Sequence, residues 1–272
     1  MLQCSLSRRR RHKTHDMIFT TRKKPPQTAT PPPLTDDDQP YVLASLAAGC
    51  GAALGLLFVA TVQRFIPGIM NAALPGFLLG LLPFQLMACG AAALTLRARV
   101  IGQSLRTAMG LPDALHLPWS TLGRVLTQLL ALYPILIAIN LAVIAVCQHF
   151  GWPMPEQALT QYARQDCSTA FWVVAALGIV LIAPVCEELL FRQVIFRSIR
   201  YFRPGHAGIW TALLFSLFHG LPQYAPALFV LGLFLQRARS EGGLAQAIVL
   251  HSVFNLISLL LIVLRVVYAP GT

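Results

Sequence analysis

Two adjacent carboxylates inside an apolar segment are the groups in this sequence best placed to do chemistry. Glu187 and Glu188 directly follow residues 172–186, which form an unbroken apolar run. A charged side chain within hydrocarbon costs about 2.5–3.5 kcal/mol even on insertion scales, so the pair requires partners and a functional reason. Helical spacing places Glu188 one turn before Arg192, whose planar guanidinium can bind a carboxylate through two parallel hydrogen bonds. Glu187 then lies about 100° round the helix and stays free for other work.

The helix is expected to be irregular next to this pair. Pro184 lacks a backbone N–H, so it should kink the helix and leave the carbonyl of Val180 without its usual partner. The two carboxylates are therefore predicted to lie at a distortion of the helix.

Counting from a predicted turn brings a histidine to the same depth as the carboxylates. The turn contains Pro204; Glu188 lies 16 residues before this proline and His219 lies 15 residues after it. In an antiparallel helical hairpin, equal distances from the turn mean equal depth, so His219 should face the carboxylate pair.

A second predicted turn, at residues 240–243, adds two more polar side chains. The chain returns through His251 and, four residues later, Asn255, which a helix places on one face. Two carboxylates, one arginine, two histidines and one asparagine can therefore converge in one buried pocket. The candidate catalytic residues are Glu187, Glu188, Arg192, His219, His251 and Asn255.

This set of groups suits hydrolysis without a covalent intermediate. A carboxylate beside a histidine can hold and deprotonate a water molecule, while His251 and Asn255 can donate hydrogen bonds to the oxyanion formed from an amide carbonyl. No serine or cysteine nucleophile motif accompanies the set. The residues indicate no cofactor. Zinc stays open because two histidines and two glutamates can bind it, although the HExxH signature of helical zinc proteases is absent.

The composition is that of a membrane protein. Hydrophobic residues make up 56% of the chain and charged residues 11%, about half of the charged share usual in soluble domains. The net charge of +11 does not indicate nucleic-acid binding, because eight of the 21 basic residues fall in the first 24 positions and most of the others flank apolar runs. The expected partners are the lipid bilayer and a membrane-associated substrate.

The hydropathy pattern predicts an all-α, polytopic membrane protein with about seven transmembrane helices. Residues 1–40 are expected to form a disordered, basic and proline-rich cytoplasmic tail, 41–150 three helices, and 169–266 a core that holds the site among the last four helices. Loop arginines favour a cytoplasmic N-terminus, and the expected location is a bacterial inner membrane. The predicted spans are 41–62, 73–96, 122–148, 169–199, 207–221, 224–236 and 244–267.

The spacing of these residues resembles the CPBP family, the CaaX-protease and bacteriocin-processing group of intramembrane glutamic endopeptidases. Its three motifs, EExxxR, FxxxH and HxxxN, occur here in order as residues 187–192, 215–219 and 251–255, within a resemblance that covers about 171–264. The resemblance implies that Glu187 and His219 activate water, that Glu188 and Arg192 position the site, and that His251 and Asn255 stabilise the oxyanion. The chain departs from the family at Gln193, where glycine is frequent, and in its seven predicted spans, where eukaryotic CaaX proteases have eight.

Three functions fit the pattern to different degrees. The favoured function is an intramembrane endopeptidase acting on a membrane-associated peptide or protein. A proton-coupled transporter could use a buried Glu/His cluster as a relay, but the internal repeat typical of transporters is not visible. A non-catalytic immunity or partner protein of the same fold is the third, in which the Glu188–Arg192 pair and the histidines serve only packing.

Overall fold

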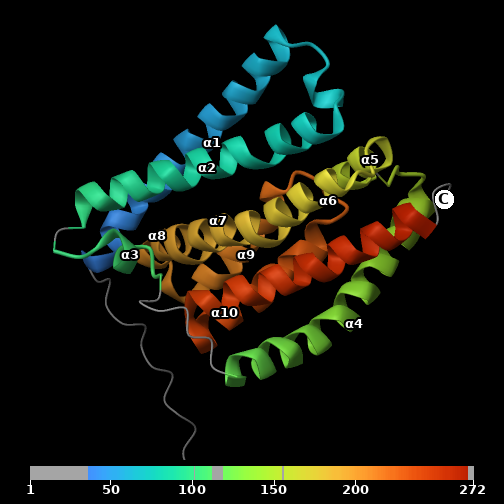
Figure 1. The fold of residues 1–272 in the computed structure, drawn as a ribbon. Helices are drawn as coiled ribbons and strands as arrows, with labels where there is room; N and C mark the ends of the chain where they lie inside the picture. The colour runs from blue at the N-terminus through green and yellow to red at the C-terminus, as the bar shows by residue number, and fades with distance from the viewer. Residues whose placement is uncertain (1–35, 101, 112–118, 155, 269–272) are drawn as a thin grey trace, which may run out of the picture. The chain divides into compact units, whose positions relative to one another are not determined.

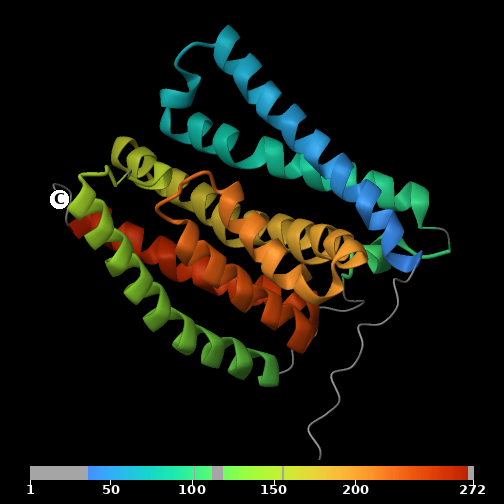
Figure 2. The same ribbon diagram turned by 180° about the vertical axis from the view of Figure 1, so that it is seen from behind.

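The computed structural model describes residues 36–100, 102–111, 119–154 and 156–268, and every regular element in these ranges is helical. Most of the predicted tail, residues 1–35, lies outside the described residues, whereas its last five residues are structured. Ten α-helical elements are shown in Figures 1 and 2: α1 Gln39–Phe65, α2 Ala73–Arg99, α3 Leu105–Ala108, α4 Trp119–Phe150, α5 Ala158–Gln165, α6 Thr169–Ala176, α7 Ala183–Glu187, α8 Phe196–Phe202, α9 Ala207–Phe218 and α10 Ala225–Tyr268. The short elements between and beside them are η1 Asp36–Asp38, η2 Ile69–Asn71, η3 Leu177–Ile182, η4 Glu188–Ile195 and η5 Pro204–His206.

Within the described residues, five helical stretches are long and apolar enough to cross a membrane. They are Gln39–Phe65, Ala73–Arg99, Trp119–Phe150, Thr169–Phe202 and Ala225–Tyr268. The first four agree with the predicted spans to within three residues at each end. The protein is therefore an all-α integral membrane protein, as the composition indicated.

The predicted count of seven spans is not confirmed. The expected fifth span corresponds to α9, which has 12 residues and is about 18 Å long at 1.5 Å per residue, well short of a ~30 Å hydrocarbon core. The expected sixth and seventh spans both fall in α10, whose helical geometry breaks at Gly242 and Gly243. Gly243 has a φ of +78°, a left-handed conformation that glycine adopts without strain. Both ribbon views show α10 turning back on itself, so the predicted second turn is present (Figures 1 and 2).

Helices α1 and α2 form a closely packed hairpin. Gly51 and Gly55 of α1 lie against the α2 backbone; a Cβ at Gly55 would stand 2.5 Å from the Cα of Phe84. Small residues of this kind let membrane helices approach closely. In turn α2 packs against α7 and η4, so the hairpin reaches the helix that carries the two glutamates.

A cap outside the apolar stretch sets the start of the helix that carries the two glutamates. The Ser168 hydroxyl accepts a hydrogen bond from the backbone N–H of Phe171, at 3.2 Å, and so satisfies a free donor of the first turn. Hydrogen bonds from the Ser168 side chain and backbone hold the pKa of the Asp166 carboxyl below its usual value. The helix therefore begins at Thr169, just before the apolar run of residues 172–186.

The distortion predicted at Pro184 takes the form of a π-helical segment, η3. The N–H of Ala183 bonds to the carbonyl of Gly178, five residues back. In that register Pro184 would bond to the carbonyl of Ile179, but proline has no N–H to donate. The Asn255 side chain supplies the missing donor, with Nδ2 2.9 Å from the Ile179 oxygen. The sequence predicted that the carbonyl of Val180 would be free. The π-helical register shifts the free carbonyl by one residue, to Ile179.

The C-terminal elements α9 and α10 pack against the helix that carries Glu187 and Glu188. After Pro204 the chain reverses into α9, which packs along α8 and η4, with the rings of Phe191 and Phe215 at 5.3 Å. α10 packs against α9, α4, η3 and η4. The segment that carries Glu187 and Glu188 therefore contacts both α2, which precedes it in the sequence, and α10, which follows it.

Candidate active site

Glu188 and Arg192 form an ion pair that is fully buried from solvent. Arg192 Nε lies 3.2 Å from Glu188 Oε2, and both side chains have 0% exposure. The pair expected from the i, i+4 spacing is therefore present, but through one hydrogen bond instead of the two parallel bonds expected. Both Nη atoms of Arg192 lack a hydrogen-bond partner among the described residues, and its guanidinium carbon lies 5.0 Å from the centre of the Phe215 ring. The aromatic face takes the place of a second hydrogen bond in holding the cation.

His251 lies between the two carboxylates. Its Nδ1 is 3.0 Å from Glu188 Oε1, and its Nε2 is 3.8 Å from Glu187 Oε2. An ionised carboxylate only accepts hydrogen bonds, so Nδ1 carries the hydrogen and Nε2 of the neutral ring is left as an acceptor. A direct bond between His251 and Glu188 does not follow from the HxxxN spacing, which gives the helix face of His251 but not its partner on another helix.

Glu187 is held on its other side by a residue that the sequence did not indicate. Gln85 of α2 donates from Nε2 to Glu187 Oε1 at 2.9 Å. The Glu187 side chain keeps 15% of its surface exposed, in contrast to the enclosed Glu188. One signal for Gln85 was present in the sequence, since it is the one amide side chain in the apolar stretch 73–96, and polar groups within membrane spans mark sites or helix contacts.

Among the described residues His219 has no direct polar contact with the glutamates, and the Phe215 side chain lies between His219 and His251. Its Nδ1 lies 2.8 Å from the backbone carbonyl of Phe215, so that nitrogen carries the hydrogen and Nε2 is the acceptor. No hydrogen bond or ion pair among the described residues joins His219 to Glu187 or Glu188. The Phe215 ring connects the two histidines, with ring centres 4.8 Å from His219 and 5.9 Å from His251.

Of the six predicted site residues, direct polar contacts join four: Glu187, Glu188, Arg192 and His251. His219 reaches the group through Phe215, and Asn255 is bonded to the Ile179 carbonyl on η3. The assembled groups can hold one carboxylate as a fixed counter-ion and leave the other, with a neutral imidazole nitrogen beside it, to take a proton from water.

The zinc site left open by the sequence has no matching arrangement in the described ranges. No group of three or more histidine, cysteine, aspartate or glutamate side chains is placed there to hold a metal ion. The arrangement therefore gives no support to a metalloendopeptidase.

The comparison with protein families finds a match over the segment that holds the six predicted site residues. Residues 169–257 match the family model described as type II CAAX prenyl endopeptidase Rce1-like. No curated protein and no solved structure matches the chain. All six predicted site residues fall within the matched segment, whereas Gln85 lies outside it.

Proposed function

From the premise that residues 169–257 are an Rce1-like domain of the CAAX protease family, we propose that this protein is an intramembrane endopeptidase. Its substrate would be a membrane-associated peptide or protein, cleaved by water that Glu187 activates. The family description names a prenyl endopeptidase, but the proposal requires only that the substrate reach a site among membrane helices.

The observation that carries the proposal is the different environment of the two glutamates. Glu188 has no exposed surface and is bonded to both Arg192 and His251, so it can neither meet substrate nor exchange protons with water readily. Glu187 has 15% of its side chain exposed, and its Oε2 faces a histidine nitrogen at 3.8 Å. Two adjacent carboxylates in such different surroundings can take two different roles in acid–base catalysis.

The chemistry follows from these positions. A water oxygen attacks the carbonyl carbon of the scissile bond while Glu187 takes a proton from the water, which gives a tetrahedral intermediate with an oxyanion. Collapse of the intermediate breaks the C–N bond, and the proton held by Glu187 passes to the leaving amine. Water is consumed and Glu187 returns to its ionised form.

The histidines and Asn255 support these steps in the proposal. His219, with Nε2 free to accept, shares the attacking water with Glu187. His251, bonded through Nδ1 to Glu188, takes up a solvent proton on Nε2 before the substrate binds, donates from this N–H to the oxyanion and keeps the proton through the cycle. Asn255 uses one amide hydrogen on the Ile179 carbonyl and has a second hydrogen to offer the same oxyanion.

We also propose that the N-terminus lies on the cytoplasmic side of a bacterial inner membrane. The basis is the positive-inside rule, because arginines cluster in the segments that join the spans at one end. These arginines are Arg97, Arg99, Arg106, Arg197, Arg200, Arg203, Arg237 and Arg239.

The test compares cleavage products of membranes that contain the wild type or Glu187→Gln, analysed by mass spectrometry of newly formed peptide ends. Glu187→Gln keeps the shape of the side chain but removes the base, so turnover should fall at least about 10²-fold to 10⁴-fold. Glu156→Gln is the matched control, since Glu156 lies outside the candidate site and pairs with Arg164. Activity should also survive serine and thiol reagents and a long incubation with a zinc chelator.

Two outcomes would overturn the proposed mechanism, and two more would favour another function. Cleavage by Glu187→Gln at the wild-type rate would contradict the glutamate–water mechanism. So would a loss of activity on treatment with a chelator that added zinc restores. Membranes that show no product dependent on the chain would favour the non-catalytic partner, and Glu187-dependent proton flux across vesicles without cleavage would favour the transporter.

A further inference from the structure

Gln85 contributes to the candidate site from outside the family domain. It lies in α2, 84 residues before the start of the matched segment at residue 169, and only 4% of its surface is exposed. Its Nε2 donates to Glu187 Oε1 at 2.9 Å. The contact fixes the rotation of the Glu187 carboxyl group, because Oε1 is tied to α2 while Oε2 faces His251.

The second polar atom of Gln85 has no partner. Its Oε1 is buried and accepts no hydrogen bond from the described residues. The ionised Glu187 can only accept, so the Gln85 amide must present its nitrogen to Glu187, and its oxygen is then left as an acceptor beside the carboxylate. An unpaired buried amide oxygen is destabilising, and sites of this kind need an explanation such as a bound water or a ligand.

On the basis of the proposed function, we propose that Gln85 is a positioning residue of the protease. Its Nε2 holds Glu187 in the rotamer that presents Oε2 to the site, and its buried Oε1 accepts a hydrogen from a second, structural water. With Glu187 fixed in one rotamer, Oε2 and His219 Nε2 take the two hydrogens of the attacking water and orient its lone pair toward the substrate carbonyl.

Two further contacts keep α2 in the register that this role needs. One turn beyond Gln85, the thiol of Cys89 lies 3.3 Å from the backbone carbonyl of Cys186, the residue just before Glu187. On α1, Gly51 and Gly55 lie close against the α2 backbone, so α2 is held from both sides.

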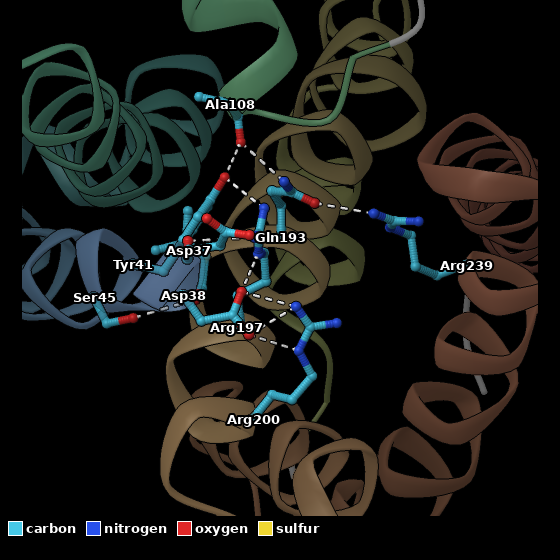
Figure 3. A network of polar contacts seen from close by, with 10 residues as sticks. Asp37, Asp38, Tyr41, Ser45, Ala108, Gln193, Arg197, Arg200 and Arg239 are labelled. Atoms are coloured by element: carbon cyan, nitrogen blue, oxygen red, sulfur yellow. Dashed lines mark hydrogen bonds and ion pairs between the residues drawn. The ribbon is translucent and has the colours of Figure 1, made fainter. Parts of the chain in front are cut away.

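A polar network at one end of the α1–α2 hairpin joins it to the family domain, as Figure 3 shows. Asp38 accepts hydrogen bonds from Arg197 at 2.6 Å and from Arg200 at 2.8 Å. Arg197 also donates to the Tyr41 hydroxyl at 2.7 Å, and Tyr41 donates to the Ala108 carbonyl at 2.7 Å. These contacts connect α1 and α3 with α8, so the hairpin is fastened to the domain that it serves.

Gln193 extends this network. Its Nε2 donates to the same Ala108 carbonyl at 2.9 Å, and its Oε1 accepts from Arg239 of α10 at 3.0 Å. The glutamine at a position where the resembled family often has glycine thus links three parts of the chain: α3, η4 and α10. The departure from the family pattern serves attachment of the N-terminal helices.

The first arm of the test is Gln85→Met, which keeps the side-chain length but removes both hydrogen-bonding atoms. A hydrogen bond to a charged group supports an expected fall in kcat of about 10-fold to 100-fold, with KM changed less than about threefold. Gln128→Met is the matched control: Gln128 is also buried and donates to a glutamate, Glu241 Oε2 at 2.8 Å, but lies outside the site. Gln128→Met should keep the wild-type kcat per folded molecule.

The second arm, Gln85→Glu, gives a readout that a packing role would not produce. The introduced carboxyl group can donate to Glu187 only when it is protonated. Its activity relative to wild type should therefore rise as the pH is lowered from about 8 to about 6, because two neighbouring carboxylates bind a proton more readily than one. Gln85→Met should show no such recovery.

The outcomes separate this inference from the proposed function. If Glu187→Gln is inactive while Gln85→Met keeps the wild-type kcat, the role of Gln85 is wrong and the protease stands. If Glu187→Gln is active, the protease itself is wrong. If Gln85→Met does not accumulate in membranes, the pH profile of Gln85→Glu decides, and a constant activity ratio across that range would overturn the inference.

Discussion

Two arginine–carboxylate clusters among the described residues, one at Glu188 and one at Asp38, lie in contrasting surroundings. Glu188 and Arg192 are fully enclosed in an apolar helix, with one hydrogen bond between them and a histidine on the other carboxylate oxygen. Asp38 is also enclosed, with 5% of its side chain exposed, but its partners Arg197 and Arg200 are 23% and 41% exposed. The first cluster has one arginine for one carboxylate, and the second has two.

On the proposed function, the difference separates an ion pair of the candidate site from an ion-pair cluster that joins helices. An ion pair taken out of water is a weak source of stability, since desolvation offsets most of the attraction and apolar residues of similar size often do as well. On the proposed function, the Glu188–Arg192 pair serves to hold His251 beside Glu187. The Asp38 cluster lies where water still screens the arginines, and it fastens α1 to α8 by several hydrogen bonds at once.

Removing one partner of the enclosed pair should have the largest effect. Arg192→Met leaves Glu188 without its counter-ion in an apolar setting, so the free energy of unfolding should fall by about 3–5 kcal/mol and cleavage should stop. Thermal unfolding in detergent and the cleavage assay measure the two effects. The double variant Glu188→Leu with Arg192→Met should be more stable than Arg192→Met alone yet still inactive. A single variant as stable as wild type would show that the pair is not buried as described.

Arg192→Lys should give an intermediate effect. Lysine keeps the charge but has no planar guanidinium to lie over the Phe215 ring at 5.0 Å. We expect a loss of about 1–2 kcal/mol in unfolding free energy and a partial loss of activity. Phe215→Leu provides the comparison, because in that background the lysine substitution should cost less. Equal costs in both backgrounds would mean that the aromatic face does not hold the cation.

Asp38→Asn tests the fastening of the hairpin. The amide cannot accept two charged donors as a carboxylate does, so stability should fall by about 1–2 kcal/mol, less than for the enclosed pair because both arginines reach water. Activity should fall only severalfold, through the looser hold on α2. Asp37→Asn is the matched control, since Asp37 is exposed and contacts Arg197 only through its backbone carbonyl. Similar losses in both variants would contradict a specific role for Asp38.

The smallest effect on stability is expected at the Arg237–Glu241 ion pair, which is more exposed than the other two. Arg237 and Glu241 lie one helical turn apart at 2.6 Å, with side-chain exposures of 70% and 33%. Arg237→Gln should change the unfolding free energy by about 0.5 kcal/mol or less, and leave cleavage unchanged. A loss comparable to that of Asp38→Asn would show that exposure does not rank these pairs.

The parts of the fold that were predictable are those set by local composition. Apolar stretches of sufficient length gave the first four spans, and i, i+4 spacing gave the Glu188–Arg192 pair. The turn at Pro204 brought η4 and α9 together, as the contact of Phe191 with Phe215 shows. Each of these rests on a rule that acts within one helix or one hairpin.

Contacts between distant helices were not predictable in the same way. His251 bonds Glu188 across 63 residues and Gln85 bonds Glu187 across 102, and no spacing rule relates such positions. Gln85 is the one amide in the apolar stretch 73–96 of α2, so the sequence indicates that this side meets another helix but not which helix it meets. The π-helical segments also shift the register, which is why the carbonyl left by Pro184 is that of Ile179. The count of seven spans was not confirmed because hydropathy does not resolve the short α9 or the break within α10.

The same two long-range bonds have a consequence for how the protein is made. Gln85 leaves the ribosome well before Glu187, and His251 leaves well after it. At ~5–20 residues per second, the interval between Gln85 and His251 is on the order of ten seconds or longer. During that interval Glu187 and Glu188 have been synthesised and Gln85 of α2 is already present, whereas His251 has not yet been synthesised. If the proposed function holds, a growing chain cannot cleave its neighbours in the membrane, because the candidate site is complete only when the helix that carries His251 is in place.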